Sequence, residues 1–264
     1  MLRVYFLQPW YGLADEALED TRYDSQALQG FARIDLAAEG VPDATTLLKF
    51  RWLLETHDLC QGLFSALNAD LSARGLLLRE GTLVDATLIA APPSTKNQAK
   101  KRDPEMHQTR KGQQWYFGMK AHLGADRDSK LVHTVVVTAA NVADITKTAA
   151  LLHGQEQQVH ADAGYTGVEK RAEIAALERK IDWQIARKRG PIKSMVEGAE
   201  KETLKAVEKA KASVRAFVEH PFHILKNLFR HRKVRYRGLA KNGHQLYTLF
   251  GLANVLIGAR AVTT

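Results

Sequence analysis

Cysteine is nearly absent from this chain of 264 residues, which has only Cys60. A single cysteine excludes an internal disulfide framework and a zinc site made of several thiolates, and it suggests a reducing compartment. Long hydrophobic runs are missing as well. The most apolar late stretch, residues 246–259, is shorter than the ~20 residues that a membrane-spanning helix needs, so we predict that it is a core helix.

Acidic residues are scarce in the last third of the chain. Residues 187–264 contain 17 Lys and Arg against 5 Asp and Glu, a net charge of +12, whereas residues 1–90 contain 7 basic and 13 acidic side chains. The whole chain carries +9. A segment this basic attracts polyanions. Nucleic acid is the first candidate partner and an anionic membrane surface the second, and a solvated lysine-rich face is the third interpretation.

Hydrophobic spacing predicts two parts. Residues 1–80 have helical periodicity over 13–18, 44–56 and 59–74, and Pro9 is expected to interrupt a helix in the first residues. The later part has strand patterns over 81–89, 115–124, 131–138, 158–162 and 182–186. Helices are predicted over 144–150, 168–180, 200–230 and 245–261, a polar basic loop over 91–113 and a linker over 187–198. The order β-β-β-α-β-α-β with helices at both ends is that of a ribonuclease-H-like mixed α/β sheet.

Three carboxylates stand at the positions where such a sheet can bring them together. Asp85 is isolated in an apolar strand, Asp162 ends a strand, and Glu219 lies on the long helix. Arg215 precedes Glu219 by four residues and Lys226 follows it by seven, so all three share one helical face. Carboxylates that converge from separate elements can hold two Mg²⁺ ions for phosphoryl transfer. The alternatives are a water-facing aspartate, a turn cap and an ordinary ion pair, respectively.

A second cluster of cations follows the carboxylates. Residues 230–237 combine several cations with Tyr236, which is typical of a surface that neutralises phosphates and stacks on an unpaired base. The loop over 96–111 is also basic and leaves the strand that bears Asp85. A solvated turn and a disordered loop are the alternatives for these two segments.

The quoted residues belong to longer stretches that resemble the DDE transposases of bacterial insertion sequences, specifically the IS5 family within the IS4-like group. The stretches are LVDAT (83–87), WYFGMK (115–120), ADAGY (161–165), and Arg215, Glu219 and Lys226 with spacings of three and six residues between them. YGLADE (11–16) and VPDATTL (41–47) resemble the helical N-terminal region of that family. The resemblance extends over essentially the whole chain.

The resemblance implies an N-terminal helical region over 1–80 and a ribonuclease-H-like catalytic domain over 81–264. Asp85, Asp162 and Glu219 would be the catalytic residues and would bind Mg²⁺ or Mn²⁺. The enzyme would cut transposon ends and join the freed 3′-OH to target DNA. It would act in the bacterial cytoplasm as a homo-oligomer on DNA at the nucleoid, with no membrane partner. DNA-binding side chains would be Arg215, Lys226, Arg230, Arg232, Lys233, Arg235, Tyr236 and Arg237.

Two departures from the family pattern leave other functions open. Ala212 stands where the family signature has a tyrosine, and we expect the N-terminal region to be shorter than in other members. A truncated, non-transposing DNA-binding remnant is therefore the main alternative. A ribonuclease-H-like nuclease without strand transfer is the other.

Overall fold

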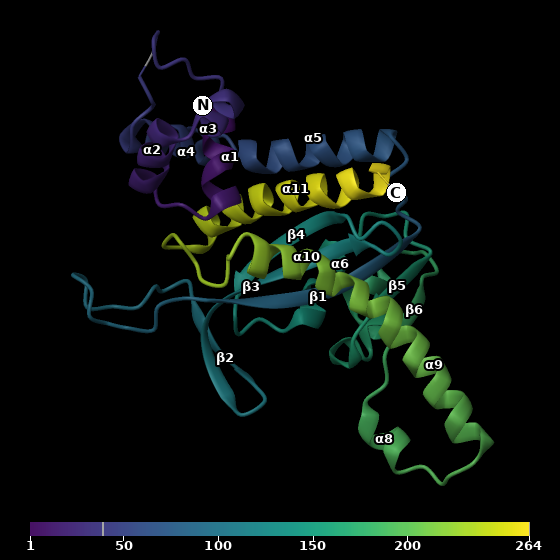
Figure 1. Ribbon diagram of the computed structural model, residues 1–264. Coiled ribbons are helices and arrows are strands. Elements are labelled where there is room, and N and C mark those ends of the chain that lie inside the picture. The colour runs from purple at the N-terminus through teal and green to yellow at the C-terminus, as the bar shows by residue number, and fades with distance from the viewer. Residues whose placement is uncertain (39, 264) are drawn as a thin grey trace.

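The computed structural model describes residues 1–38 and 40–263, and in that part of the chain six strands form one mixed sheet (Figure 1). The strands are β1 (Gly81–Ala90), β2 (His107–Lys111), β3 (Gln114–Asp126), β4 (Val132–Ala139), β5 (Gln158–Ala161) and β6 (Asp182–Ile185). Their order is β2-β3-β1-β5-β6, with β4 paired to β3. The pairs β1–β3 and β3–β4 are antiparallel, whereas β1–β5 and β5–β6 are parallel. The predicted mixed sheet is confirmed.

One strand lies inside the segment predicted as a loop over 91–113, so that prediction is wrong for its last part. β2 pairs with the start of β3 in a hairpin whose two-residue turn begins at Gly112, with a φ of 62°. Such turns favour glycine because its left-handed backbone costs little. The strand was missed because all five residues of β2 are polar, so they show no apolar alternation.

The N-terminal helices are α1 (Leu2–Tyr11), α2 (Asp15–Asp24), α3 (Gln26–Ala32), α4 (Ala44–Thr56) and α5 (Leu59–Ala73). The predicted interruption at Pro9 is wrong, because α1 continues through it. Pro9 lies near the end of α1, so its missing N–H removes one late backbone bond, and the helix ends normally at left-handed Gly12. The buried side chains of Val4 and Tyr5 hold α1 in the local core.

Several helices of the second part are shorter than their periodicity indicated, whereas the last helix is longer than predicted and one short helix forms inside the segment predicted as a linker over 187–198. They are η1 (Asp144–Lys147), α6 (Thr148–Leu151), η2 (Ala163–Tyr165), η3 (Val168–Lys170), α7 (Ala172–Ala175), α8 (Arg189–Lys193), α9 (Ala199–Arg215), η4 (Ala216–Val218), α10 (Glu219–His223), η5 (Ile224–Leu228) and α11 (Leu239–Thr263). Asp144 starts a 3₁₀ turn without capping it, because its carboxylate instead pairs with Lys120 at 2.8 Å. The predicted helix over 168–180 is two short pieces.

Pro221 shapes the long helical stretch after α9. The chain tightens into the 3₁₀ turn η4 just before it and widens into the π turn η5 after it. This change of pitch is the restart that the proline ring predicts, since a regular helix would bring the ring against the carbonyl of Phe217.

Two apolar layers enclose the sheet. On one face Leu83 and Ile89 of β1 pack with α5, α10 and α11, where Leu246 and Phe250 are fully buried. On the other face Val84 packs with Leu151 of α6. α5 and α11 lie side by side along the molecule in Figure 1, and they contact each other closely. Because α5 precedes residue 80 yet contributes to this main core, a domain boundary at that residue stays a prediction.

The core contains the lone cysteine and the apolar C-terminal helix. Cys60 is buried, as are the inward side chains of α11. No helix among the described residues is long and apolar enough to cross a membrane.

Candidate active site

Asp85 and Asp162 come from neighbouring parallel strands. β1 pairs with β5 only over residues 81–83, so Asp85 lies just beyond the last pair, and Asp162 directly follows β5. Parallel strands end at the same edge of a sheet, which is where α/β folds bind ligands. The edge of β1 beyond residue 83 is therefore left open towards β5, and the two carboxylates meet there.

Burial dominates the electrostatics of Asp85. Its side chain is 17% exposed, and its pKa is raised from 3.8 to about 6, mainly by burial and further by the negative charge of Asp162. The Ala86 amide, which donates to Asp85 Oδ1 at 2.8 Å, and the Arg215 guanidinium lower the pKa and offset part of this shift. The negative charge of buried Asp85 is thus only partly stabilised by its neighbours, and a second carboxylate lies beside it.

Asp162 combines both interpretations that the sequence left open. Its Oδ1 accepts a hydrogen bond from the Gly164 amide at 2.8 Å and caps η2, so it does serve as a turn cap. The cap fixes the carboxylate at the open edge of the sheet, and its Oδ2 accepts no hydrogen bond from the described residues.

Arg215 lies between the first and third carboxylates. Its Nη2 is 3.4 Å from Asp85 Oδ2 and 3.5 Å from Glu219 Oε1. The Glu219 side chain is 65% exposed, so it approaches the site from the solvent side. Among the described residues no three His, Cys, Asp or Glu side chains are close enough to hold one metal ion. The structure brings Glu219 to Asp85 only through the guanidinium.

The donor set nevertheless suits a hard divalent cation. Carboxylate oxygens are the ligands that Mg²⁺ prefers, and excess negative charge at buried Asp85 and neighbouring Asp162 is what such an ion would relieve. Glu219 is exposed and free of tight packing, so its side chain can turn towards the same edge.

Tyr165 is a member of this site that the sequence did not single out. Its hydroxyl is buried without a hydrogen-bond partner, and its pKa is raised by burial and by the charges of Asp85, Asp144 and Asp162. The sequence feature that could have identified Tyr165 is its position three residues after Asp162. Histidine His160, by contrast, is packed inside the fold, where burial lowers its pKa.

A large cavity opens beside the carboxylates. It has a volume of about 850 Å³ and runs from Asp162 and Arg215 along α9 to α8. Ala212 lines it, so the small side chain at this position leaves space next to Arg215. The cationic residues on the wall are Arg187, Lys188, Lys193, Lys201, Lys205, Lys209 and Arg215.

In the basic segment 230–237 some side chains contact other parts of the fold and others are exposed to solvent. Arg235 donates to the carbonyls of Leu13 and Gly12 at 2.9 Å each, which ties the end of α1 to this segment. The Tyr236 ring lies 5.1 Å from the Arg51 guanidinium, which covers one of its faces. Arg230 and Lys233 are exposed.

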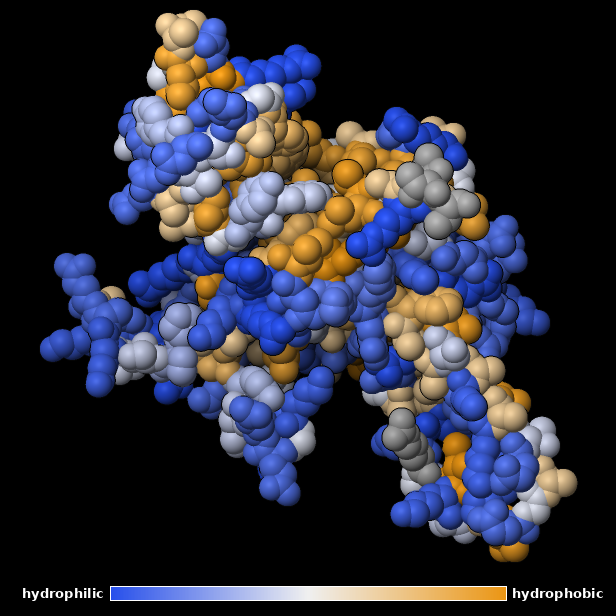
Figure 2. Space-filling view, viewed as in Figure 1, coloured by the Kyte–Doolittle hydropathy of each residue, from blue (hydrophilic) through white to orange (hydrophobic). Residues whose placement is uncertain are grey.

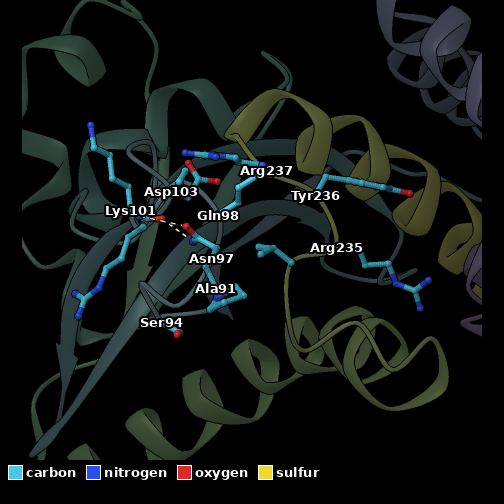
Figure 3. Close-up of a pocket in the computed structure, with 13 residues that line it drawn as sticks. Ala91, Ser94, Asn97, Gln98, Lys101, Asp103, Arg235, Tyr236 and Arg237 are labelled. Carbon is cyan, nitrogen blue, oxygen red and sulfur yellow. Dashed lines mark hydrogen bonds between the residues drawn. The ribbon is translucent and has the colours of Figure 1, made fainter.

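Arg237 and Lys101 line a second cavity, of about 530 Å³, between the segment after β1 and the start of α11 (Figure 3). In this close-up Asn97 is hydrogen-bonded to the Lys101 backbone. Asp103 accepts from the Gly238 amide at 2.7 Å and closes the far side.

Two models of known protein families match this chain. The family model described as "Transposase DDE domain" matches residues 77–255, and the model described as "Transposase domain (DUF772)" matches residues 1–52. No solved structure matches the chain. The first match spans more than half of the chain and contains all three carboxylates and Arg215. The chain therefore belongs to the DDE transposases.

Proposed function

We propose that this transposase mobilises a bacterial insertion sequence of the IS5 family, cutting the ends of the element and joining the freed 3′-OH to target DNA. Family membership makes DNA the substrate. The observation that carries the proposal is the meeting of Asp85 and Asp162 at one open sheet edge, with Arg215 linking Asp85 to Glu219. The helical region over 1–80 and the catalytic domain over 81–264 would act as one unit.

Asp85, Asp162 and Glu219 would hold Mg²⁺ or Mn²⁺. Bound there, the ions would activate the attacking oxygen and stabilise the leaving one in each in-line displacement. In the first displacement water attacks the phosphodiester at the element end and a 3′-OH leaves. In the second, that 3′-OH attacks a target phosphodiester, forms a new ester and releases a target 3′-OH.

The side chains of this protein position the DNA for those steps. Arg215 is within reach of a phosphate placed between Asp85 and Glu219, because its guanidinium is 30% exposed and already lies between their oxygens. The cavity of about 850 Å³ that starts at Asp162 is lined by seven cations against Glu197 and Glu208, a basic excess that suits one DNA strand leaving the carboxylates. Arg230, Arg232, Lys233, Arg235, Tyr236 and Arg237 would contact the flanking duplex together with Lys226.

Cleavage and joining on the ends of the encoding element test the proposal. We expect strand cutting with Mg²⁺ or Mn²⁺, and its loss in Asp85→Asn, Asp162→Asn and Glu219→Gln. Glu202→Gln, on the exposed face of α9, is the matched control and should cut like the parent. If a triad variant cuts as well as this control, that residue is not a ligand.

The same assay separates the alternatives. A DNA-binding remnant would bind the ends without cutting them, and a nuclease would cut without joining the 3′-OH to a second duplex. Two ends must be held for insertion, so we also propose a homo-oligomer on DNA. Light scattering of the protein with an end duplex should give a mass of at least two chains.

A further inference from the structure

Three cations converge on a small cavity beyond Asp85. The cavity has a volume of about 210 Å³ and lies along the last residues of β1, where Thr87 is two residues from Asp85 on the same face of the strand. Lys111 reaches it from the β2–β3 hairpin, Lys226 from η5 and Arg232 from the segment after η5. The remaining lining residues are Leu88, Ile89, Ala90, Tyr116 and Phe117.

None of these cations forms an ion pair with a carboxylate of the described residues. Lys226 and Lys111 form no ion pair within the described residues, and the Arg232 guanidinium donates only to the Lys226 carbonyl, at 3.1 Å, and to Asn227. Lys226 is half-buried, and its pKa is lowered first by burial and then by repulsion from Lys111 and Arg232, which the negative charge of Asp85 offsets only in part. Gathering like charges at a half-buried point is unfavourable unless an anion binds there.

The hairpin presents different side chains on its two faces. Thr109, Lys111 and Tyr116 belong to one face by register, whereas Arg110 and Trp115 belong to the other. Lys111 and Tyr116 line the cavity, as does Phe117 from the other face of the ribbon, whereas Arg110 does not. Arg110 is exposed on the opposite face and donates to the Gly112 carbonyl.

Gly118 fixes where the hairpin departs from the sheet. A Cβ at this position would meet the Ile89 carbonyl at 2.1 Å, so only glycine lets β3 run this close to β1. The hairpin then projects from the sheet as a hydrophilic arm, seen in Figures 1 and 2 on the same side as α9. The cavity lies at the base of this arm.

We propose that the 210 Å³ cavity is a subsite for one backbone phosphate of the DNA strand next to the one attacked at Asp85, and that Lys111 makes the hairpin part of it. The inference rests on the proposed function, because it takes the ligand to be the substrate strand. A phosphodiester supplies the missing negative charge and fits a polar cavity of this size, and Thr87 and Lys226 on the core side fix its distance from the carboxylates.

The test uses neutral phosphates. A duplex ending at the terminus of the encoding element is made as a series, each member with one methylphosphonate in place of one phosphate, and binding is followed by fluorescence anisotropy without divalent metal. We expect one position near the cleaved end at which the parent loses affinity by about tenfold. Lys111→Gln should bind the unmodified duplex about tenfold more weakly, lose nothing further at that position, and reduce the salt slope by about one.

Arg110→Gln is the charge-matched control one residue away on the other face. It should keep the position-specific loss, and Lys111→Arg should restore it. If Lys111→Gln keeps the parent's methylphosphonate profile, or if Arg110→Gln abolishes it equally, the subsite is wrong. A parent that shows the profile but never cuts with Mg²⁺ would overturn the proposed function and keep the subsite. A parent that cuts without the profile would do the reverse.

Discussion

Replacing Asp85 by asparagine should stabilise this protein at neutral pH while removing its activity. The pKa of the carboxyl is raised from 3.8 to about 6 in the folded chain, so ionised Asp85 is worse accommodated in the folded state than in the unfolded one. About two pKa units correspond to about 3 kcal/mol of unfolding free energy. At neutral pH the parent bears this cost and an uncharged asparagine does not.

The direction of the Asp85 pKa shift determines how the stability difference depends on pH. Because the folded pKa lies above the unfolded value, folding favours the proton, and the parent loses stability as pH rises from 3.8 through about 6. The advantage of Asp85→Asn should therefore be near zero at pH 4, grow between pH 4 and 6, and be complete above pH 6. Urea unfolding of both proteins in the presence of a chelator measures the difference directly.

Asp126→Asn is the opposing control. Asp126 is fully buried and accepts four hydrogen bonds, from the amides of Arg79, Asp128 and Ser129 and from the Ser129 hydroxyl. An asparagine there turns one acceptor into a donor, so we expect a loss of about 1–3 kcal/mol. The reasoning about Asp85 is refuted if Asp85→Asn is no more stable than the parent at pH 7.5, or if its advantage is the same at pH 4.

Three other outcomes follow from contacts in the structure. Mg²⁺ should raise the unfolding temperature of the parent but not of Asp85→Asn. A ligand that binds only the folded state stabilises it by about 2.7 kcal/mol at one hundred times its Kd. An equal rise in both proteins would place the ion elsewhere. Arg235→Ala should lower the unfolding free energy by about 1–2 kcal/mol, since it removes both hydrogen bonds to the end of α1. Lys233→Ala, at an exposed position, should change it little. Equal urea midpoints for the two variants would mean that Arg235 does not hold α1. Asn254→Leu should lower the unfolding free energy by about 2–4 kcal/mol in the same assay, because Asn254 accepts a hydrogen bond from the Val132 amide and donates one to Asn68 inside the core. An unchanged urea midpoint would show that these groups find other partners.

The sheet could be predicted well wherever apolar residues dominate. β1, β5 and β6 agree with their predicted ranges to within a residue or two because their alternating or apolar patterns are local properties. β2 escaped because His107–Lys111 are all polar and pair only with the projecting start of β3. The interruption predicted at Pro9 was wrong because a tertiary effect outweighs a local one. The proline does remove one backbone hydrogen bond, but the packing of α1 outweighs that loss near the helix end.

The candidate site was predictable in its carboxylates and less so in its cations. Asp85, Asp162 and Glu219 stand out by position in strand, strand end and helix. Nothing in the run of residues 230–237 distinguishes Arg235, which binds the end of α1, from Arg232, which faces the cavity below Asp85. The same holds for Lys111 and Arg110, which are neighbours in the chain but lie on opposite faces of a ribbon that the sequence presents as a loop.

By itself the sequence determined the order of the apolar strands, the three candidate carboxylates and a basic C-terminal third, because periodicity, burial preference and charge count depend on residues near one another in the chain. Only the tertiary structure decided that Arg215 lies between Asp85 and Glu219, that Tyr165 joins them, and that Lys111 meets Lys226. These contacts join residues far apart in sequence, and their electrostatic effect depends on distance and burial, which exist only once the elements have packed.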